Sequence, residues 1–268
     1  MIKLKKTALF LAALMLCALF TACANTKLVT AIKYAENGLE FRVNEDRITC
    51  TIVGMGKCTD TEVEVPENIS IYKVTAIGKE AFCGEIDEVA AKITKVTLPE
   101  GVQSIGERAF QGCRELTAIN LPNSIKEIGL GAFWDCSSLD NVIIPNSLSV
   151  ISSQTFYACT SLSSIVIPDS VKSIEEGSFT LSGVRTVTIG SGVEYIEGMA
   201  FAYCEKLEEF YYNGSIEEWR KVTLFNLALD DYGIVIHCSD GDCTRLFYSY
   251  QFSETKVQSP SLQWITIP

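Results

Sequence analysis

A motif of about 23 residues is repeated along the middle of this chain, and it limits the folds that the chain can adopt. The copy from Ile105 to Pro122 returns at Ile128 to Pro145 and again at Ile151 to Pro168, with Phe, Cys and a closing proline at matching places. A fixed period of this length is typical of a solenoid, in which each copy forms one coil and stacks on the next. The sequence therefore predicts a row of stacked coils.

Two apolar patterns can be placed within each copy. Residues 116–121 have the period-two spacing of a short strand, and stacked copies place these strands in a parallel sheet. Residues 125–136 have three- and four-residue spacing, which predicts an extended corner followed by a short helical or 3₁₀ turn. We therefore expect a β-rich α/β solenoid of about six coils, with a cap at each end. Its core should hold one phenylalanine per coil: Phe82, Phe110, Phe133, Phe156, Phe179 and Phe201.

The repeat cysteines indicate a buried packing site rather than disulfides. Cys113, Cys136, Cys159 and Cys204 share one phase of the repeat, and Ser182 holds that phase in the copy between the last two. A position that accepts a small residue once per coil is typical of a core, where free cysteine is common.

The N-terminus has the form of an export signal. Three lysines lie within residues 1–6, and the sixteen residues from Thr7 to Ala22 carry no charge. The segment from Phe20 to Cys23 resembles a bacterial lipobox, which predicts cleavage of a signal peptide, 1–22, and a lipid on Cys23. Ordinary secretion is the alternative, because Phe20 stands where that motif prefers Leu. A spanning helix is less favoured, since the run is shorter than the roughly 20 residues that a membrane requires.

The rest of the chain divides around the repeats. We expect a linker at 23–36, an N-terminal β-hairpin cap at 37–62, the repeats at 63–212 and a C-terminal cap at 213–243; residues 244–268 show no repeat phase and are not placed. The hairpin should join residues 48–53 to residues 61–65 through the glycine turn at 54–56. Cys50 and Cys58 flank that turn and could pair across it.

The charge of the chain argues against nucleic acid as a partner. After removal of residues 1–22, 19 Lys and Arg face 33 Asp and Glu, a net charge of −14. Such a surface repels phosphate backbones and anionic lipids. Contact with a membrane should then come only from the lipid on Cys23.

The sequence offers no convincing catalytic, metal or cofactor site. Its single histidine, His237, falls in the predicted C-terminal cap, while the repeat cysteines are predicted to be buried. His237, Cys238 and Cys243 are three ligand types where zinc normally takes four, so a disulfide between the two cysteines or plain packing is favoured. We expect a protein that is not an enzyme and binds no cofactor.

The outward strand positions are the candidate binding face. Exposed apolar groups flanked by small polar ones often mark such a surface, although β-branched residues also simply suit strands. Trp134, beside a core phenylalanine, is a further candidate contact. The strand-face candidates are Asn120, Asn141, Ile143, Val166, Thr188 and Tyr211.

The repeat resembles that of the BspA-like leucine-rich repeat family (leucine-rich repeat type 5) of bacterial surface proteins, from about Val63 to Asp242. The resemblance implies a right-handed, curved solenoid on an exported protein, and several members are associated with adhesion. Prolines such as Pro122 stand where other leucine-rich repeats carry a buried asparagine, so no asparagine ladder is expected.

The expected function is therefore recognition or adhesion at the cell surface. A monomer would bind a protein or glycan of a host or neighbouring cell through the strand face. A structural spacer or envelope component without a specific ligand is the alternative.

Overall fold

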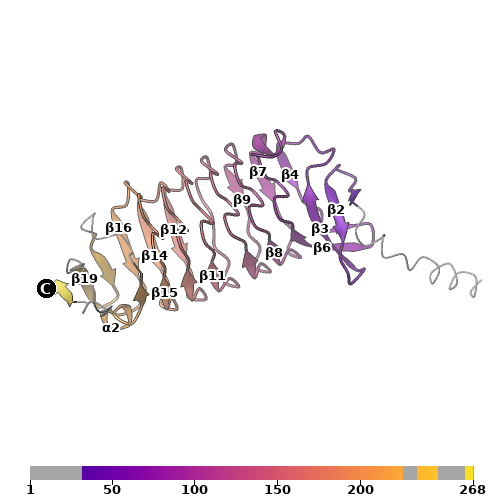
Figure 1. The fold of residues 1–268 in the computed structure, drawn as a ribbon. Coiled ribbons are helices and arrows are strands. Elements are labelled where there is room, and N and C mark those ends of the chain that lie inside the picture. The colour runs from indigo at the N-terminus through magenta and orange to yellow at the C-terminus, as the bar shows by residue number, and fades with distance from the viewer. Residues whose placement is uncertain (1–31, 226–233, 247–262, 268) are drawn as a thin grey trace, which may run out of the picture.

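Stacked coils form an elongated solenoid, seen from the side in Figure 1. The computed structural model describes residues 32–225, 234–246 and 263–267, so the predicted signal peptide 1–22 and Cys23 lie outside the described residues. The only helices in the described part are the short η2 (Ala90–Lys92) and α2 (Ile216–Trp219). No helix there is long and apolar enough to cross a membrane. The predicted solenoid is confirmed.

One long side of the solenoid, which we call the strand face, carries one segment from every coil. The paired segments run parallel, as expected for strands that recur once per coil. The row holds about eight coils rather than six, because strands at residues 62–64 and 236–238 extend it at its two ends. Its strands are β4 (Glu62–Glu64), β7 (Lys95–Thr97), β9 (Ala118–Ile119), β12 (Ser164–Ile167), β14 (Thr186–Ile189), β16 (Glu209–Tyr212) and β18 (Ile236–Cys238).

A second set of parallel strands lines the corner of each coil. Their buried members are the aliphatic residues that precede each turn, such as Ile105 and Ile128. The corner strands are β3 (Thr49–Gly54), β6 (Tyr72–Ile77), β8 (Ser104–Ile105), β10 (Glu127–Ile128), β11 (Val150–Ile151), β13 (Ser173–Ile174), β15 (Tyr195–Ile196) and β17 (Thr223–Leu224).

Both sheets are interrupted at the same level, which we call the coil junction. The corner sheet ends at β10 and a new one begins at β11, while the strand-face sheet ends at β9 and resumes at β12. Residues 140–144 lie between β9 and β12 and make no backbone hydrogen bond to either neighbouring coil. Asp140 and Asn141 occupy the start of that segment, and both residue types are depleted from strands.

The turn segment around each phenylalanine differs from the predicted 3₁₀ turn. From Phe110 to Phe201, residues two places before and two places after the phenylalanine have left-handed backbone, for example Gln154 (φ 57°) and Ala158 (φ 56°) around Phe156. Such residues are strained unless the surroundings hold them. Here alternate N–H groups donate to the next coil: Gln154 to Glu176, Phe156 to Ser178 and Ala158 to Thr180, at 2.8–3.0 Å. This turn ladder also crosses the coil junction, through Gly131, Phe133 and Asp135.

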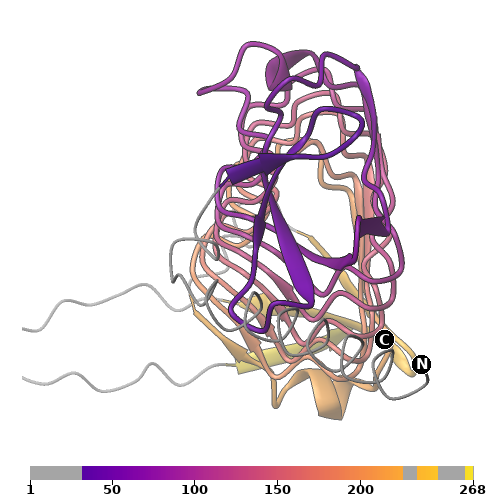
Figure 2. The same ribbon diagram turned by 90° about the vertical axis from the view of Figure 1, so that its right-hand side faces the viewer.

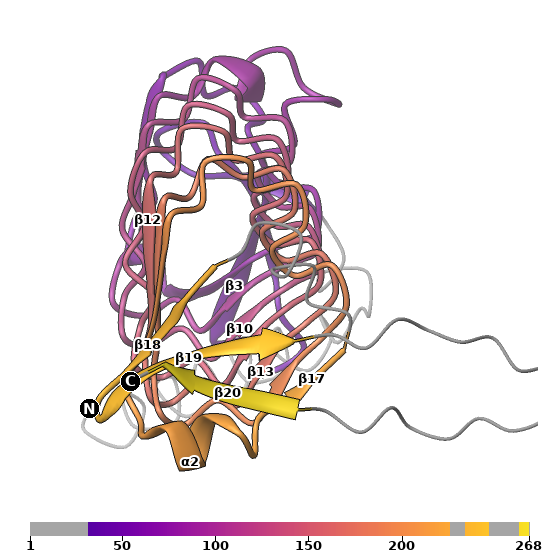
Figure 3. The same ribbon diagram turned by 90° about the vertical axis from the view of Figure 1, so that its left-hand side faces the viewer.

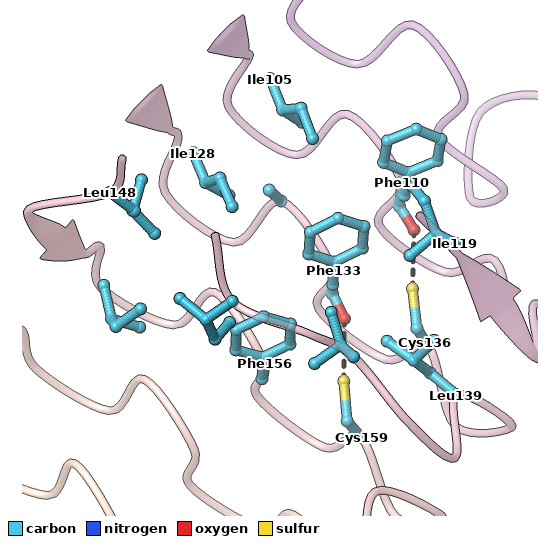
Figure 4. Close-up of a cluster of buried hydrophobic side chains, with 14 of the residues drawn as sticks. Ile105, Phe110, Ile119, Ile128, Phe133, Cys136, Leu139, Leu148, Phe156 and Cys159 are labelled. Atoms are coloured by element: carbon cyan, nitrogen blue, oxygen red, sulfur yellow. Dashed lines mark hydrogen bonds between the residues drawn. The ribbon is translucent and has the colours of Figure 1, made fainter. Parts of the chain in front are cut away.

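The core is a stack of phenylalanines, as the sequence predicts. Neighbouring rings from Phe82 to Phe201 lie 5.1–5.5 Å apart between centroids and are nearly parallel. Figure 4 shows Phe110, Phe133 and Phe156 with the thiols of Cys136 and Cys159 beneath them. Each fully buried side chain of this kind contributes roughly 1.5–3 kcal/mol. Phe210 ends the stack edge-on, and Trp219 of α2 packs against it.

The N-terminal cap exists, but its hairpin was predicted between the wrong strands. The strand at residues 49–54 pairs antiparallel with β2 (Glu40–Val43), not with residues 61–65. Residues 62–64 form β4 and join the strand-face sheet instead. The two segments therefore belong to different sheets: residues 49–54 pair with β6 in the corner sheet, and residues 62–64 pair with β7 in the strand-face sheet. The cap also includes β1 (Ile32–Tyr34), which lies within the predicted linker 23–36, and β5 (Asn68–Ile69). Figure 2 shows the cap across the end of the stack.

The C-terminal cap is larger than the predicted 213–243. After β18, the antiparallel strand β19 (Gly241–Leu246) runs past residue 243 and pairs with β20 (Gln263–Ile267), which lies in the segment that the sequence could not place. These strands lie across the end of the stack, above α2, in Figure 3. A serine at 215 and Glu218 begin α2 with a capping box, so its short helix is locally encoded.

Candidate functional site

The strand face presents the outward columns that the repeat phase predicts. Ile143 and Val166 are 76% and 61% exposed, and Tyr211 is 39% exposed. Thr188 is half-buried between Val166 and Tyr211 in register. The inward neighbours in the same strands, such as Ile165 and Val187, are fully buried. The predicted face is therefore a real surface with apolar side chains on it.

A hollow of about 670 Å³ lies in this face at the coil junction. We call it the junction hollow. Three predicted residues, Asn120, Asn141 and Ile143, line it, and Val166, Thr188 and Tyr211 lie beyond it toward the C-terminal end. Residues that the sequence reading did not select also line it, namely Lys95, Asn123, Asp140 and Asn146. The signal that could have found two of them is the asparagine after proline in successive coils, at 123 and 146.

Asn120 is a structural residue as well as an exposed one. Its amide oxygen accepts a hydrogen bond from the Leu98 N–H at 2.7 Å, and its amide nitrogen donates to the Leu98 carbonyl at 2.8 Å. The side chain thereby takes the place of a neighbouring backbone strand. Both of its polar groups are committed to the preceding coil, so its amide is less free to contact a ligand than the sequence predicts.

The other amides of the hollow are free to contact a ligand. Asn123, Asn141 and Asn146 are exposed, and their side chains make no hydrogen bond among the described residues. Asp140 and Lys95 are also exposed and form no ion pair there. By contrast, Asp169, which follows proline one coil later, accepts hydrogen bonds from the N–H and hydroxyl of Ser191. Uncommitted polar groups therefore gather at the junction.

A second polar group of residues lies at the C-terminal end of the strand face. The imidazole of His237 lies between two carboxylates, with Nδ1 2.8 Å from Asp242 Oδ1 and Nε2 3.2 Å from Glu209 Oε2. The Tyr211 ring packs 5.0 Å from the imidazole, and a hydrogen bond to Glu209 raises the pKa of the Tyr211 phenol. Both ring nitrogens of His237 are thus engaged by carboxylates.

The cysteines of the described chain are buried or partly buried thiols. Cys50 and Cys58 are free, so the pairing considered for them is not formed, and Cys238 and Cys243 are also free with their sulfurs 4.0 Å apart. Burial raises the pKa of Cys238 to about 12, which keeps that thiol protonated. Within the described ranges, no group of three His, Cys, Asp or Glu side chains is arranged to hold a metal ion.

Trp134 does not belong to the strand face. It lies on a turn segment, is half-buried, and packs against Tyr157 at 4.7 Å between ring centroids. A smaller hollow of about 290 Å³ follows on the same turn segments, lined by residues that include Tyr157, Leu181 and Tyr203. The predicted site residues therefore fall on two different sides of the coils.

The chain is similar to known bacterial leucine-rich repeat proteins. A family model described as BspA type Leucine rich repeat region matches six copies over residues 75–208. A crystal structure of a leucine rich repeat protein from T. pallidum is 30% identical, with a TM-score of 0.61, and the match covers 73% of this chain and 83% of that chain.

A second solved structure, a leucine rich cell surface protein from Faecalibacterium prausnitzii A2-165, is 27% identical with a TM-score of 0.51. That match covers 67% of this chain and 54% of the other, so the chain spans about half of that protein. No curated protein sequence matches the chain.

Proposed function

The chain belongs to the BspA-type leucine-rich repeat family, and from this premise we propose that it is a non-enzymatic recognition module that binds its partner through the strand face at the cell surface. The observation that carries the proposal is the junction hollow, which interrupts an otherwise regular face and gathers side chains with no internal partner. The core residues that repeat in every coil are buried, so specificity must come from the positions between them.

Among the described residues, neither the repeat thiols nor His237 forms an activated nucleophile, which supports a binding role. Burial raises the pKa of the repeat thiols, to about 12 for Cys113 and about 11 for Cys204, so they remain protonated at neutral pH. His237 is held by two carboxylates rather than by a thiol or hydroxyl. If the chain had a histidine-dependent activity, His237→Ala would abolish it.

Display outside the cell is supported by the N-terminal sequence and by the F. prausnitzii relative, whose name describes a cell surface protein. We propose that residues 1–22 are removed and that a lipid on Cys23 anchors a monomer to the membrane. Metabolic labelling with radioactive palmitate checks this: Cys23→Ala should lose the label. Equal labelling of the variant would show that the lipid is attached elsewhere, and no label on either protein would show that the protein is simply secreted.

The partner class is a protein or glycan of a host or neighbouring cell. An unbiased screen with residues 24–268 against matrix proteins and printed glycans would identify it. Replacing Ile143, Val166 and Tyr211 together with Ser should then abolish binding, because these are the exposed apolar groups of the face. Ile86→Ser is the matched control, since Ile86 is 69% exposed on a loop away from the face. Binding that survives the triple change in a folded protein would exclude the strand face.

A structural spacer without a specific ligand is the second candidate. The regular stacking of coils and the charged surface suit such a role equally. A screen that is negative for every protein and glycan would favour it.

A further inference from the structure

We propose that the junction hollow binds an uncharged, polyhydroxylated ligand, a neutral oligosaccharide. This inference rests on the proposed function and narrows it to one ligand class at one place. It follows from four properties of the hollow: its free amides, its size, its charge and its lack of aromatic anchors.

The free amides fit hydroxyl groups. Each asparagine amide offers a donor and an acceptor side by side, and adjacent sugar hydroxyls offer the same pair. Asn123, Asn141 and Asn146 all line the hollow and have no hydrogen-bonding partner among the described residues. They come from two successive coils, so a ligand can be contacted from both sides of the junction. The exposed aliphatic side chain of Ile143 offers an apolar surface for the C–H side of a sugar ring.

The size of the hollow suits a small oligosaccharide. Sites for small ligands have volumes of roughly 300–1,000 Å³, and the hollow has about 670 Å³. It exists because residues 140–144 leave the strand ladder on both sides. The same strand-face position in the other repeat coils is occupied by a hydrogen-bonded strand.

The charge of the hollow disfavours an ionic ligand. Lys95 and Asp140 are its two charged lining residues, and they balance each other. The mature chain carries 33 acidic against 19 basic side chains, so an acidic polysaccharide would also be repelled at longer range. Amides, whose hydrogen bonding does not depend on ionisation, carry most of the polar lining.

A protein partner would find few anchors in the hollow. Protein interfaces concentrate their binding energy in Trp, Tyr and Arg, and Met is also enriched there. None of these residue types lines the junction hollow. Exposed Met199 and Tyr203, with the half-buried Tyr157, line the smaller hollow on the turn segments instead. The composition of the hollow therefore disfavours a protein partner, and the positive case for a sugar rests on the free amides.

Binding of residues 24–268 to an array of neutral, sialylated and sulfated oligosaccharides tests the proposal. We expect hits among neutral glycans, followed by calorimetry with one hit. Asn141→Ala with Asn146→Ala should weaken binding by about tenfold or more, since each lost hydrogen bond costs about 1 kcal/mol. Asn213→Ala is the matched control, because Asn213 is also exposed and free of side-chain hydrogen bonds in the described chain. Thermal unfolding of each variant confirms that the coils remain folded.

The outcomes separate this proposal from the broader one. Hits confined to charged glycans, no hits at all, or binding unchanged in the double variant would overturn the neutral-saccharide site. If a protein partner instead binds in an Ile143-dependent manner, recognition by the strand face stands and only the ligand class is wrong. If neither glycans nor proteins bind, the proposed function fails as well.

Discussion

The buried cysteines show how a single side chain joins two coils. The Cys136 thiol donates to the Phe110 carbonyl and the Cys159 thiol to the Phe133 carbonyl, each at 3.2 Å. Both side chains are fully buried. Ser182 takes the same place in one coil, and its hydroxyl lies 3.4 Å from the Cys204 sulfur. The requirement at this position is therefore a small donor, and the thiols stay unpaired because the core encloses each of them.

Ionisation of these thiols predicts a loss of stability at alkaline pH. Burial raises the pKa of Cys113 from 9.0 to about 12, so the unfolded chain releases this proton at lower pH than the folded chain does. The stability that the protonated Cys113 thiol contributes is fully present below about pH 9 and is lost as the pH rises toward 12. Between neutral pH and pH 10.5, the free energy of unfolding of Cys113→Ser should therefore fall less than that of the wild type. The difference between the two losses should be on the order of 1–2 kcal/mol.

Urea unfolding at a series of pH values checks this prediction. Replacing Cys113 with Ser keeps a small hydrogen-bond donor, as Ser182 does naturally. Tyrosine and lysine titration affects wild type and variant alike, so only the difference between their pH profiles is informative. Parallel profiles would mean that the thiol ionises equally in the folded and unfolded chains.

At the scale of one coil, the phenylalanine stack is the main apolar element. Phe156 lies in mid-stack, 5.5 Å from Phe133 and 5.4 Å from Phe179 between ring centroids. Phe156→Ala should lower the free energy of unfolding by about 3–5 kcal/mol, because it leaves a cavity between two rings. Tyr157→Ala is the control, since the neighbouring Tyr157 is half-buried on the turn segment. Denaturant titration that gave equal losses for both would contradict the stacking argument.

The coil junction predicts local differences in hydrogen exchange. Residues 140–144 lack backbone hydrogen bonds to the adjacent coils, whereas β14 is paired along its whole length with β12 on one side and β16 on the other. The amides of 141–144 should exchange by small local openings, about a hundredfold faster than those of 186–189. Mass spectrometry of exchange in peptides that cover the two segments measures this. Equal protection would mean that the ladder closes in solution.

The period of the sequence predicts which residues face the core, but not which strands pair. Buried columns such as Ile165 and Val187 follow from the 23-residue spacing, since residues at the same position of successive copies stack on one another in the core. The hairpin at residues 49–54 was assigned the wrong partner because alternation identifies a strand and says nothing of its neighbour. The junction hollow was partly missed for a similar reason. Only the structure shows that the Asn120 amide is hydrogen-bonded to the Leu98 backbone, while the Asn123 and Asn146 amides have no hydrogen-bonding partner among the described residues.

At the scale of the whole molecule, the solenoid consists of two regular halves joined at the coil junction. The N-terminal half carries the sheets from β3 to β10 and from β4 to β9, and the C-terminal half carries those from β11 to β17 and from β12 onward. Across the junction the halves are connected by the turn ladder, the phenylalanine stack, the thiol ladder and side chains such as Ser152, whose hydroxyl donates to the Ile128 carbonyl, rather than by paired strands.

The weaker junction predicts that the two halves can unfold separately. In stacked repeats, stability is the sum of coil terms and nearest-neighbour terms, so a weak interface lowers cooperativity there. Phe179→Ala should therefore populate, at intermediate urea, a state in which the C-terminal half is unfolded and the N-terminal half remains protected. Phe110→Ala should produce the opposite state, because each ring lies at the same place in its own half.

Pulsed hydrogen exchange at intermediate urea distinguishes the two variants. Peptides within residues 49–128 should stay protected in Phe179→Ala, and peptides within 164–212 should stay protected in Phe110→Ala. Both variants are needed, because one half of the solenoid could unfold first in a single variant merely because that half is less stable in the wild type. A single transition in which all coils lose protection together, in both variants, would show that the turn ladder and the phenylalanine stack suffice to couple the whole solenoid.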